Sequence, residues 1–258
     1  MLWHIEGTET FLLATVHVSD MNPLWLPTET RRVLERSTRL IFEHDLDGQP
    51  KLSVLMLPKG VRLGDLVSES VFKAAASHWR QLGLAPKEMF AVMPGRVAQI
   101  LSMTTADRAG LKGQYGIDRH LWNQSGNMGK SKELLEDFAG VIDAMAAIPM
   151  PEQVPALAET VGKHDLGLSE VRSLLTAWML NDVAHLERLL VDRTIKYPVM
   201  MEKIITSRNE SWLSFIVATA RSGTPSLIAV GALHLVGPTG IPALLEERGF
   251  SVTLRPNR

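Results

Sequence analysis

Two histidines stand at matching places in apolar segments near opposite ends of the chain. His17 follows the run LLATV and His234 follows AVGAL, each with a small residue, Ala14 or Gly231, three positions before it. Ligands of α/β proteins bind beyond the carboxyl ends of the strands, so two histidines that end such strands can meet in space. The small residues would let the backbone or a ligand approach closely.

A carboxylate ends a third segment in the same way, since Glu43 follows the apolar residues 40–42. A lone buried carboxylate is costly, so we expect Glu43 to be exposed, paired or bound to a metal ion. Two histidines and one carboxylate are a common ligand set for a divalent ion that keeps an open position for water. Such an ion lowers the pKa of that water and polarises a substrate carbonyl. His17, Glu43 and His234 are therefore the candidate metal ligands, and a hydrogen-bonded structural role is the alternative for each.

The other histidines are weaker candidates. His44 follows Glu43 directly and would point to the opposite face of its strand, so we interpret it as structural or as a residue that orients a ligand. The remaining five stand in no repeated context, and surface or packing roles explain them: His4, His78, His120, His164 and His185.

The segments that must position these residues are strand and helix units at both ends of the chain. Residues 11–18 predict a strand, 27–38 a helix and 39–43 a second strand, an order that favours a parallel crossover connection. The C-terminal end repeats the order of strand, helix and strand, over residues 227–235, 241–248 and 250–254.

Between these units the patterns predict mostly helices. The expected helices cover residues 69–82, 94–106, 116–126, 137–147, 168–191 and 198–221. Residues 132–136 indicate a short strand, and Pro149 and Pro151 indicate breaks. We therefore predict an α/β fold with a mixed, largely parallel central sheet built from the N- and C-terminal units. The chain, residues 1–258, is expected to form one domain whose helical insert, roughly 69–222, covers the cleft.

Composition narrows the class of protein. The 258 residues are 45% hydrophobic, which is enough for a large core. The 27 basic and 28 acidic side chains nearly cancel, and no basic stripe favours a nucleic acid partner. The absence of cysteine excludes disulfides and thiol chemistry. No apolar run is long enough to span a membrane. We expect a soluble protein, cytoplasmic as the sequence stands and periplasmic or secreted if a signal peptide has been removed.

Several short motifs, in their order and spacing, resemble the TraB/GumN family. They are a Leu-Trp opening, ATVH at 14–17, FEHD at 42–45, YGID at 115–118, LLEDF at 134–138, RNESW at 208–212 and VGALHLVGPTGIPALLEERGF at 230–250. That family includes the Tiki-type proteases and is related in fold to the ChaN haem-uptake proteins and the erythromycin esterases. Ala14 departs from the glycine usual there, and we expect the site to tolerate it because alanine accepts a negative φ.

The resemblance implies a metal-dependent peptidase with His17, Glu43 and His234 as ligands of Mn²⁺ or Co²⁺, with Zn²⁺ also compatible. The resemblance also points to Arg208 and Asn209, the first two residues of the motif RNESW at 208–212. Arg208 shares a helix face with Trp212 and could hold a substrate carboxylate or stabilise an oxyanion, and Asn209 could donate to the same centre. The alternative for Arg208 is a structural pair with a carboxylate such as Glu43.

Two further acids complete the candidate site. Asp118 in YGID could act in the site or pair with Arg208, although a helix cap also explains it. Glu136 in LLEDF could orient a ligand or cap the following helix.

Three classes of function are compatible with these residues. The first is a metal-dependent hydrolase, most directly a peptidase. The second is a metal-free hydrolase resembling the erythromycin esterases, in which a histidine is the general base and Glu43 orients it. The third is a non-catalytic protein that binds a peptide, a small ligand or haem. The expected partner is thus a peptide or small-molecule substrate, and the sequence leaves the oligomeric state open, a homodimer included.

Overall fold

A computed structural model describes residues 1–20, 26–48, 52–162 and 164–256, and the side chains of residues 52 and 164–167 lie outside this description. The core is a six-stranded sheet in the order β4-β3-β5-β2-β1-β6. The strands are β1 Leu2–Ile5, β2 Thr10–Thr15, β3 Arg39–Phe42, β4 Ser131–Leu134, β5 Ser226–Gly231 and β6 Val252–Arg255. Strands β4, β3, β5 and β2 are mutually parallel, and β1 runs antiparallel to both β2 and β6. The predicted mixed, largely parallel α/β sheet is confirmed.

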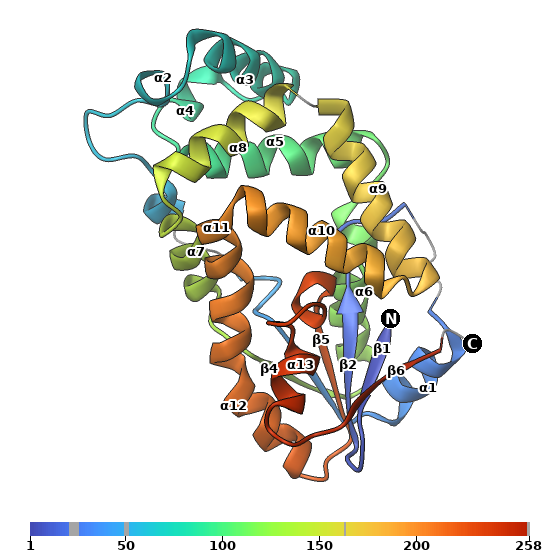
Figure 1. The fold of residues 1–258 in the computed structure, drawn as a ribbon. Coiled ribbons are helices and arrows are strands. Elements are labelled where there is room, and N and C mark those ends of the chain that lie inside the picture. The colour runs from blue at the N-terminus through green and yellow to red at the C-terminus, as the bar shows by residue number, and fades with distance from the viewer. Residues whose placement is uncertain (21–25, 49–51, 163, 257–258) are drawn as a thin grey trace.

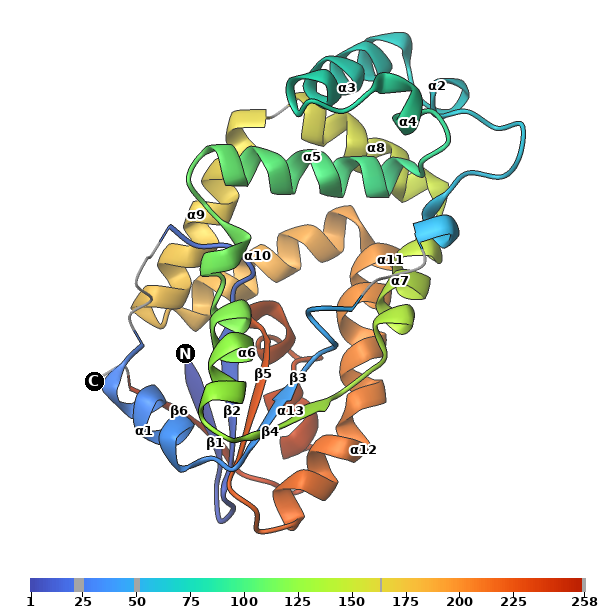
Figure 2. The same ribbon diagram turned by 180° about the vertical axis from the view of Figure 1, so that it is seen from behind.

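The central strands are buried because helices cover both faces of the sheet. The helices are α1 Thr28–Arg36, α2 Leu63–Leu66, α3 Glu69–Gln81, α4 Pro86–Met89, α5 Pro94–Arg108, α6 Ile117–Asn127, α7 Phe138–Ala146, α8 Met150–Gly162, α9 His164–Leu180, α10 Val183–Lys196, α11 Pro198–Met201, α12 Ser207–Arg221 and α13 Ile241–Glu246. Figure 1 shows α12 and α13 on one face of the sheet, and Figure 2 shows α6 on the other. Five of the six residues of β5 are buried, as expected for a near-continuous apolar strand of a parallel sheet.

The buried apolar residues form two separate clusters. One surrounds the sheet and includes Leu13, Ile41 and Ile228. The other lies among α3, α5, α7 and α8 and includes Trp79 and Leu157. In both views α5 and α8 lie beyond the ends of the strands, with α10 between them and the sheet (Figures 1 and 2). The helical middle of the chain therefore has a core of its own above the edge where the parallel strands end.

One helix prediction is wrong and one helix was not predicted, each for a local reason. The helix expected over 168–191 is divided into α9 and α10, because Asn181 adopts a left-handed φ of 61° and Asp182 caps α10. The break predicted from Pro149 and Pro151 separates α7, which ends at Ala146, from α8, which begins at Met150 and was not predicted. Pro151 lies in its first turn, where a missing N–H leaves no hydrogen bond unmade.

The strand ends also differ from the prediction. The first expected strand, 11–18, is β2 and stops at Thr15. Across the described ranges, no helix combines the length and the apolar character that a membrane span needs.

Candidate active site

The parallel strands end at one edge of the sheet, and each is followed there by one polar candidate residue. In the order β4, β3, β5 and β2, these are Glu136, Glu43, His234 and His17. Carboxyl ends of parallel strands are the usual ligand site of such sheets. The topology therefore brings together side chains that are distant in sequence.

The turn after β5 corrects the predicted strand over 227–235. The strand ends at Gly231, and Ala232–Leu235 form a 3₁₀ turn that carries His234. The Gly231 N–H donates to Glu43 Oε1 at 2.6 Å, so the site's own carboxylate accepts the bond from the last residue of the strand. The turn buries His234, whose residue is only 4% exposed.

His17 is held by a carboxylate from α6. Its Nδ1 lies 2.6 Å from Asp118 Oδ2, while Asp118 makes no helix-capping bond. The start of α6 abuts the segment after β2, since the Ile117 N–H donates to the Val16 carbonyl at 2.9 Å. A Cβ on Gly116 would stand 2.5 Å from the His17 carbonyl oxygen, so only glycine fits. Asp118 therefore orients His17 from the first turn of α6, where its negative charge also suits the helix N-terminus.

The negative charge of Asp118 raises the pKa of His17 from 6.5 towards about 9. The His17 side chain is 63% exposed, so water screens this attraction and the pKa lies between these two values. The ring is the most accessible of the candidate groups. With Nδ1 bound to Asp118, Nε2 is the atom available for chemistry.

Arg208 lies between two carboxylates. Its Nη2 donates to Glu43 Oε2 at 2.6 Å and its Nε donates to Glu136 Oε1 at 2.7 Å. Its Nη1 donates to the Ile204 carbonyl at 3.0 Å and lies 3.3 Å from His234 Nε2. The structural pair with Glu43 that the sequence left open is therefore present, whereas the other suggested partner, Asp118, contacts His17 instead.

The two carboxylates beside Arg208 differ in protonation tendency. Burial alone would raise the pKa of Glu43. The positive charge of Arg208, that of His234 when it is protonated, and the hydrogen bond from the Gly231 N–H all lower this pKa, and together they outweigh burial. The pKa of Glu43 is thus held well below its usual range. Burial raises the pKa of Glu136, and the charge of Glu43 adds to that effect. Glu43 therefore ionises more readily than Glu136.

Asn209 fixes His234 rather than facing a substrate. His234 Nδ1 lies 2.6 Å from Asn209 Oδ1, and Asn209 Nδ2 donates to the Thr239 carbonyl at 2.8 Å. Because the amide oxygen only accepts, this contact assigns the proton to Nδ1 and the lone pair to Nε2. Trp212 packs on the His234 ring at 4.7 Å and under the Arg208 guanidinium at 4.6 Å. The shared face of Arg208 and Trp212 is confirmed.

Burial lowers the pKa of His234 to about 4, which links this residue to stability. Between pH 6.5 and about 4 the unfolded chain binds a proton at His234 that the folded chain does not. Its stabilising contribution is complete above pH 6.5 and declines as the pH falls, by about 1.4 kcal/mol per unit of pKa difference. We expect His234→Gln to lose less stability than the wild type over this window, measured as urea unfolding free energy. Equal losses in the two proteins would contradict the assignment.

A π-helical turn precedes Arg208 and was not foreseen from the sequence. The helix expected over 198–221 contains this turn at Glu202–Thr206, and the Ser207 N–H donates to Glu202, five residues back. Single π-turns inside helices occur frequently at functional sites. Here the turn lies directly before Arg208, whose guanidinium is bound to the carbonyl of Ile204 within it. The turn thus helps to aim Arg208 at the two carboxylates.

Gly231 marks the point on which the site converges. A Cβ built there would lie 3.3 Å from Glu43 Oε1, 3.6 Å from His234 Cδ2 and 3.8 Å from His17 Nε2. Both imidazoles and the carboxylate therefore surround one small volume. The interpretation of Gly231 as a close-approach residue fits this arrangement.

We expect Gly231→Ala to fold and to lose activity. The backbone φ of −54° suits alanine, but the added methyl group would press on Glu43 and reduce the space between the histidines. A misplacement of this kind lowers kcat/KM by about tenfold or more. The control is Gly126→Ala, where a Cβ would meet nothing within 4 Å. Unchanged activity in Gly231→Ala would show that this space is not used.

The structure brings all seven candidate residues to one edge of the sheet. Arg208, Glu43, Glu136, His234 and Asn209 form one network, and the pair of His17 and Asp118 lies beside it across Gly231. His234 Nε2 and Glu43 Oε1 are 3.9 Å apart. As the side chains stand, no three His, Asp or Glu residues in the described part of the chain are spaced to hold a metal ion. Their chemical roles thus stay predictions.

The other histidines lie outside this network. His44 stacks on Phe138 at 4.5 Å, His4 stacks on Phe11 at 4.3 Å, and His185 lies 2.6 Å from the Ser173 hydroxyl. The side chain of His164 is not among those described. These contacts fit the predicted packing roles.

Comparison with known proteins agrees with the motifs. The profile of the TraB/PrgY/gumN family matches residues 1–254. YbaP of Escherichia coli strain K12 is 25% identical over 249 residues, 94% of this chain and 90% of its own length. YbaP of Shigella flexneri is 25% identical over 241 residues, 91% and 87% of the two chains. Both are described as uncharacterized proteins, and no solved structure matches the chain. Because the family profile covers nearly the whole sequence, the chain belongs to the TraB/PrgY/gumN family.

Proposed function

We propose that the chain is a hydrolase that cleaves peptide bonds, with a divalent ion held by His17, Glu43 and His234. One observation carries this proposal. Asp118 holds Nδ1 of His17 and Asn209 holds Nδ1 of His234, so neither of these bonds uses the Nε2 atom of its histidine. Partners of this kind orient the histidines of metal sites. An ion bound there would activate a water and polarise the substrate carbonyl.

The donor set fits such an ion in its chemistry, with two imidazole nitrogens and one ionised carboxylate. The preference for Mn²⁺ or Co²⁺ over Zn²⁺ rests on the resemblance to Tiki-type proteases. Arg208 competes with the ion, because it lies 2.6 Å from Glu43 Oε2 and 3.3 Å from His234 Nε2. In this proposal Arg208 keeps Glu43 ionised, Asn209 fixes His234, and Asp118 fixes His17.

The contacts of Arg208 favour a second candidate, a metal-free hydrolase. A guanidinium already neutralises Glu43, and the pair of Asp118 and the exposed His17 has the geometry of a base with its orienting carboxylate. His17 Nε2 would then take a proton from the attacking water. The ion pair of Arg208 and Glu43 would then have a structural role in the site.

Metal removal separates the two candidates. We expect the protein dialysed against EDTA to lose cleavage of unstructured peptides and to regain it with Mn²⁺ or Co²⁺. Metal content, measured by mass spectrometry, should fall in His17→Ala and in His234→Ala and should stay unchanged in the control His185→Ala.

Cleavage that persists in the chelator would overturn the metal proposal and favour the second candidate. Tight peptide binding without turnover under every condition would instead favour a non-catalytic binding protein.

A further inference from the structure

Arg208 contacts the same ligand atoms that a divalent ion would need. Its Nη2 donates to Glu43 Oε2 at 2.6 Å, and its Nη1 lies 3.3 Å from His234 Nε2. The proton of the His234 ring is on Nδ1, which faces Asn209, so the lone pair of Nε2 faces the guanidinium. As the side chains stand, the cation bound to Glu43 and His234 is therefore the guanidinium of Arg208.

Arg208 has a second carboxylate partner, Glu136, and this pair is incomplete. The Nε and Nη2 atoms of Arg208 lie 2.7 and 2.6 Å from one and the same oxygen, Glu136 Oε1. The other oxygen, Oε2, has no hydrogen-bond partner among the residues that the structure describes. Glu136 can therefore accept a further bond from a guanidinium that it already contacts.

A complete pair of this kind exists on the strands that precede Glu43 and Glu136. Arg39 of β3 donates through Nε to Glu133 Oε1 and through Nη2 to Glu133 Oε2, both at 2.6 Å. Such pairs with two parallel bonds are the strong geometry between arginine and carboxylate. The Nη2 of Arg208 donates to Glu43 instead of making this second bond. Release from Glu43 would allow Arg208 and Glu136 to form a complete pair.

Two further contacts hold the guanidinium close to Glu136. Its Nη1 donates to the Ile204 carbonyl at 3.0 Å, and the group lies over the Trp212 ring at 4.6 Å. The two carboxylates are neighbours, because the Glu136 N–H donates to the Glu43 carbonyl at 2.9 Å. A short movement of the Arg208 guanidinium is therefore enough to change its partner.

We infer that Glu136 is a positioning residue that takes Arg208 away from Glu43 and His234 when a divalent ion binds. The inference rests on the proposed function, because it concerns the metal ion of that site. Until the ion binds, Arg208 neutralises Glu43. In the shift, Arg208 gives up Glu43 and His234 and stays paired with Glu136. Without Glu136 the same shift would leave a buried guanidinium unpaired, which is costly.

The test is the affinity of the full chain for Mn²⁺, measured by isothermal titration calorimetry on protein freed of metal with EDTA and then of EDTA. Arg208→Gln removes the competing cation, so Mn²⁺ should bind about tenfold or more tightly, because like charges this close repel strongly. Glu136→Gln removes the residue that receives Arg208, so Mn²⁺ should bind about 10- to 100-fold more weakly. An ion pair with a purely structural role would weaken binding in both variants.

A double substitution separates two ways for Glu136 to act. If Glu136 acts through Arg208, Glu136→Gln should change the Mn²⁺ affinity by less than about twofold in a chain that already carries Arg208→Gln. If Glu136 instead attracts the ion by its own charge, the full weakening persists in that chain. This second result would overturn the inference.

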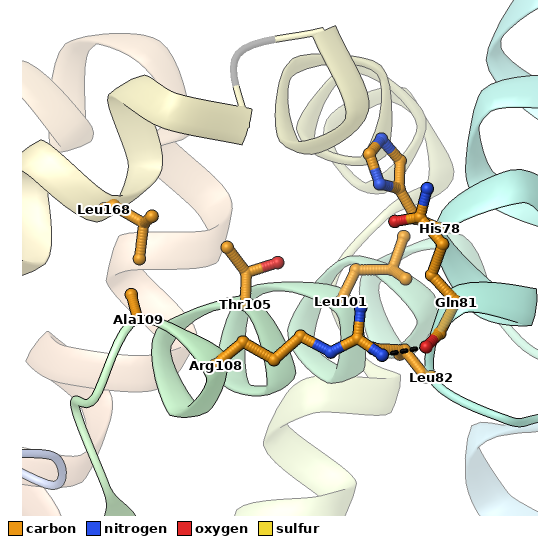
Figure 3. Close-up of a pocket in the computed structure, with 8 residues that line it drawn as sticks. All are labelled: His78, Gln81, Leu82, Leu101, Thr105, Arg108, Ala109 and Leu168. Atoms are coloured by element: carbon orange, nitrogen blue, oxygen red, sulfur yellow. Dashed lines mark hydrogen bonds between the residues drawn. The ribbon is translucent and has the colours of Figure 1, made fainter.

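Two controls test whether these changes are local. Glu133→Gln breaks the complete pair with Arg39 and should leave the Mn²⁺ affinity unchanged. Arg108→Gln removes an arginine that lines a cavity of about 260 Å³ and donates to the Gln81 carbonyl (Figure 3). It frees no ligand atom of the site, so this affinity should also stay unchanged.

Glu136→Asp keeps the carboxylate and should recover most of the affinity that Glu136→Gln loses. Arg208→Met replaces Arg208→Gln if circular dichroism shows that the latter is unfolded. If neither Arg208 variant folds, the two Glu136 variants decide, and equal Mn²⁺ affinities of both overturn the inference. Unchanged or weaker binding in a folded Arg208 variant, or no binding in any protein of the series, has the same consequence.

Failure of the proposed function is distinguishable from failure of this inference. If only the proposed function fails, no protein of the series cleaves peptides with Mn²⁺, while the opposite changes in affinity at Arg208 and Glu136 persist. If only the inference fails, cleavage depends on the metal ion, and the substitutions at Arg208 and Glu136 leave the Mn²⁺ affinity unchanged.

Discussion

The substitution His17→Ala is expected to lower kcat for peptide hydrolysis by about 100- to 10,000-fold, the contribution of a positioned base. The loss of a metal ligand would have an effect in the same direction. Some stability should also be lost, because Asp118, whose side chain is only 13% exposed, loses its partner. The measurement is kcat on one fluorogenic peptide, with urea unfolding as the check on stability. His185→Ala, which removes a histidine bonded to Ser173 away from the strand ends, should keep its activity.

His17 needs an unprotonated Nε2 both as a metal ligand and as a general base, so the activity should depend on the protonation of this residue. The charge of Asp118 raises the pKa of His17, so activity should rise with pH through a value between 6.5 and about 9. Asp118→Asn removes that charge and should move the pKa down, which an NMR titration of the ring protons can follow. The raised pKa of His17 also makes the stability of the fold depend on pH. The pair of His17 and Asp118 stabilises the fold fully below pH 6.5 and ceases to do so as the pH rises through the folded pKa. An unchanged His17 pKa in Asp118→Asn would contradict the assigned pair.

The second large effect is expected at Arg208. Arg208→Met should destabilise the protein by about 3–5 kcal/mol, the usual cost of leaving a buried charge without its partner. The side chains of Arg208, Glu43 and Glu136 are only 12%, 9% and 15% exposed, so water cannot replace the guanidinium. The double substitution Arg208→Met with Glu43→Gln should recover part of the loss, because it removes the stranded charge.

The control is Arg32→Met, which breaks a surface pair with Glu29 in which the arginine is 70% exposed. It should change the unfolding free energy by about 1 kcal/mol or less. Urea denaturation of all four proteins gives the comparison. Similar losses at Arg208 and Arg32 would mean that the buried network contributes little to stability.

Much of the fold could be predicted because its signals are local. The apolar runs at 11–18, 39–43 and 227–235 identified three of the parallel strands, and 132–136 identified the fourth. The errors occurred where one residue changed the local path. Asn181 divides one expected helix by adopting a left-handed conformation, and Gly231 ends a strand earlier than its apolar sequence indicated.

The candidate site could be assembled from sequence only as a set of residue types. His17, His234 and Glu43 were recognisable because each follows an apolar strand, and the family motifs added Arg208 and Asn209. Their partners could not be assigned, and the π-turn before Arg208 left no recognisable pattern. The suggested pair of Arg208 with Asp118 shows the limit, because Asp118 contacts His17 and Arg208 contacts Glu43 and Glu136.

The sequence by itself determined the family, the α/β class and the positions of polar residues at strand ends, since periodicity and motif order are properties of neighbouring residues. The tertiary structure decided which of these residues meet. Strand β5 lies between β3 and β2, so His234 stands between Glu43 and His17 although the chain reaches it last. The packing of α5 and α8 over α10 and α11 likewise created a cavity whose lining reaches Ile204. Contacts of this kind depend on strand order and helix packing, which local propensity does not encode.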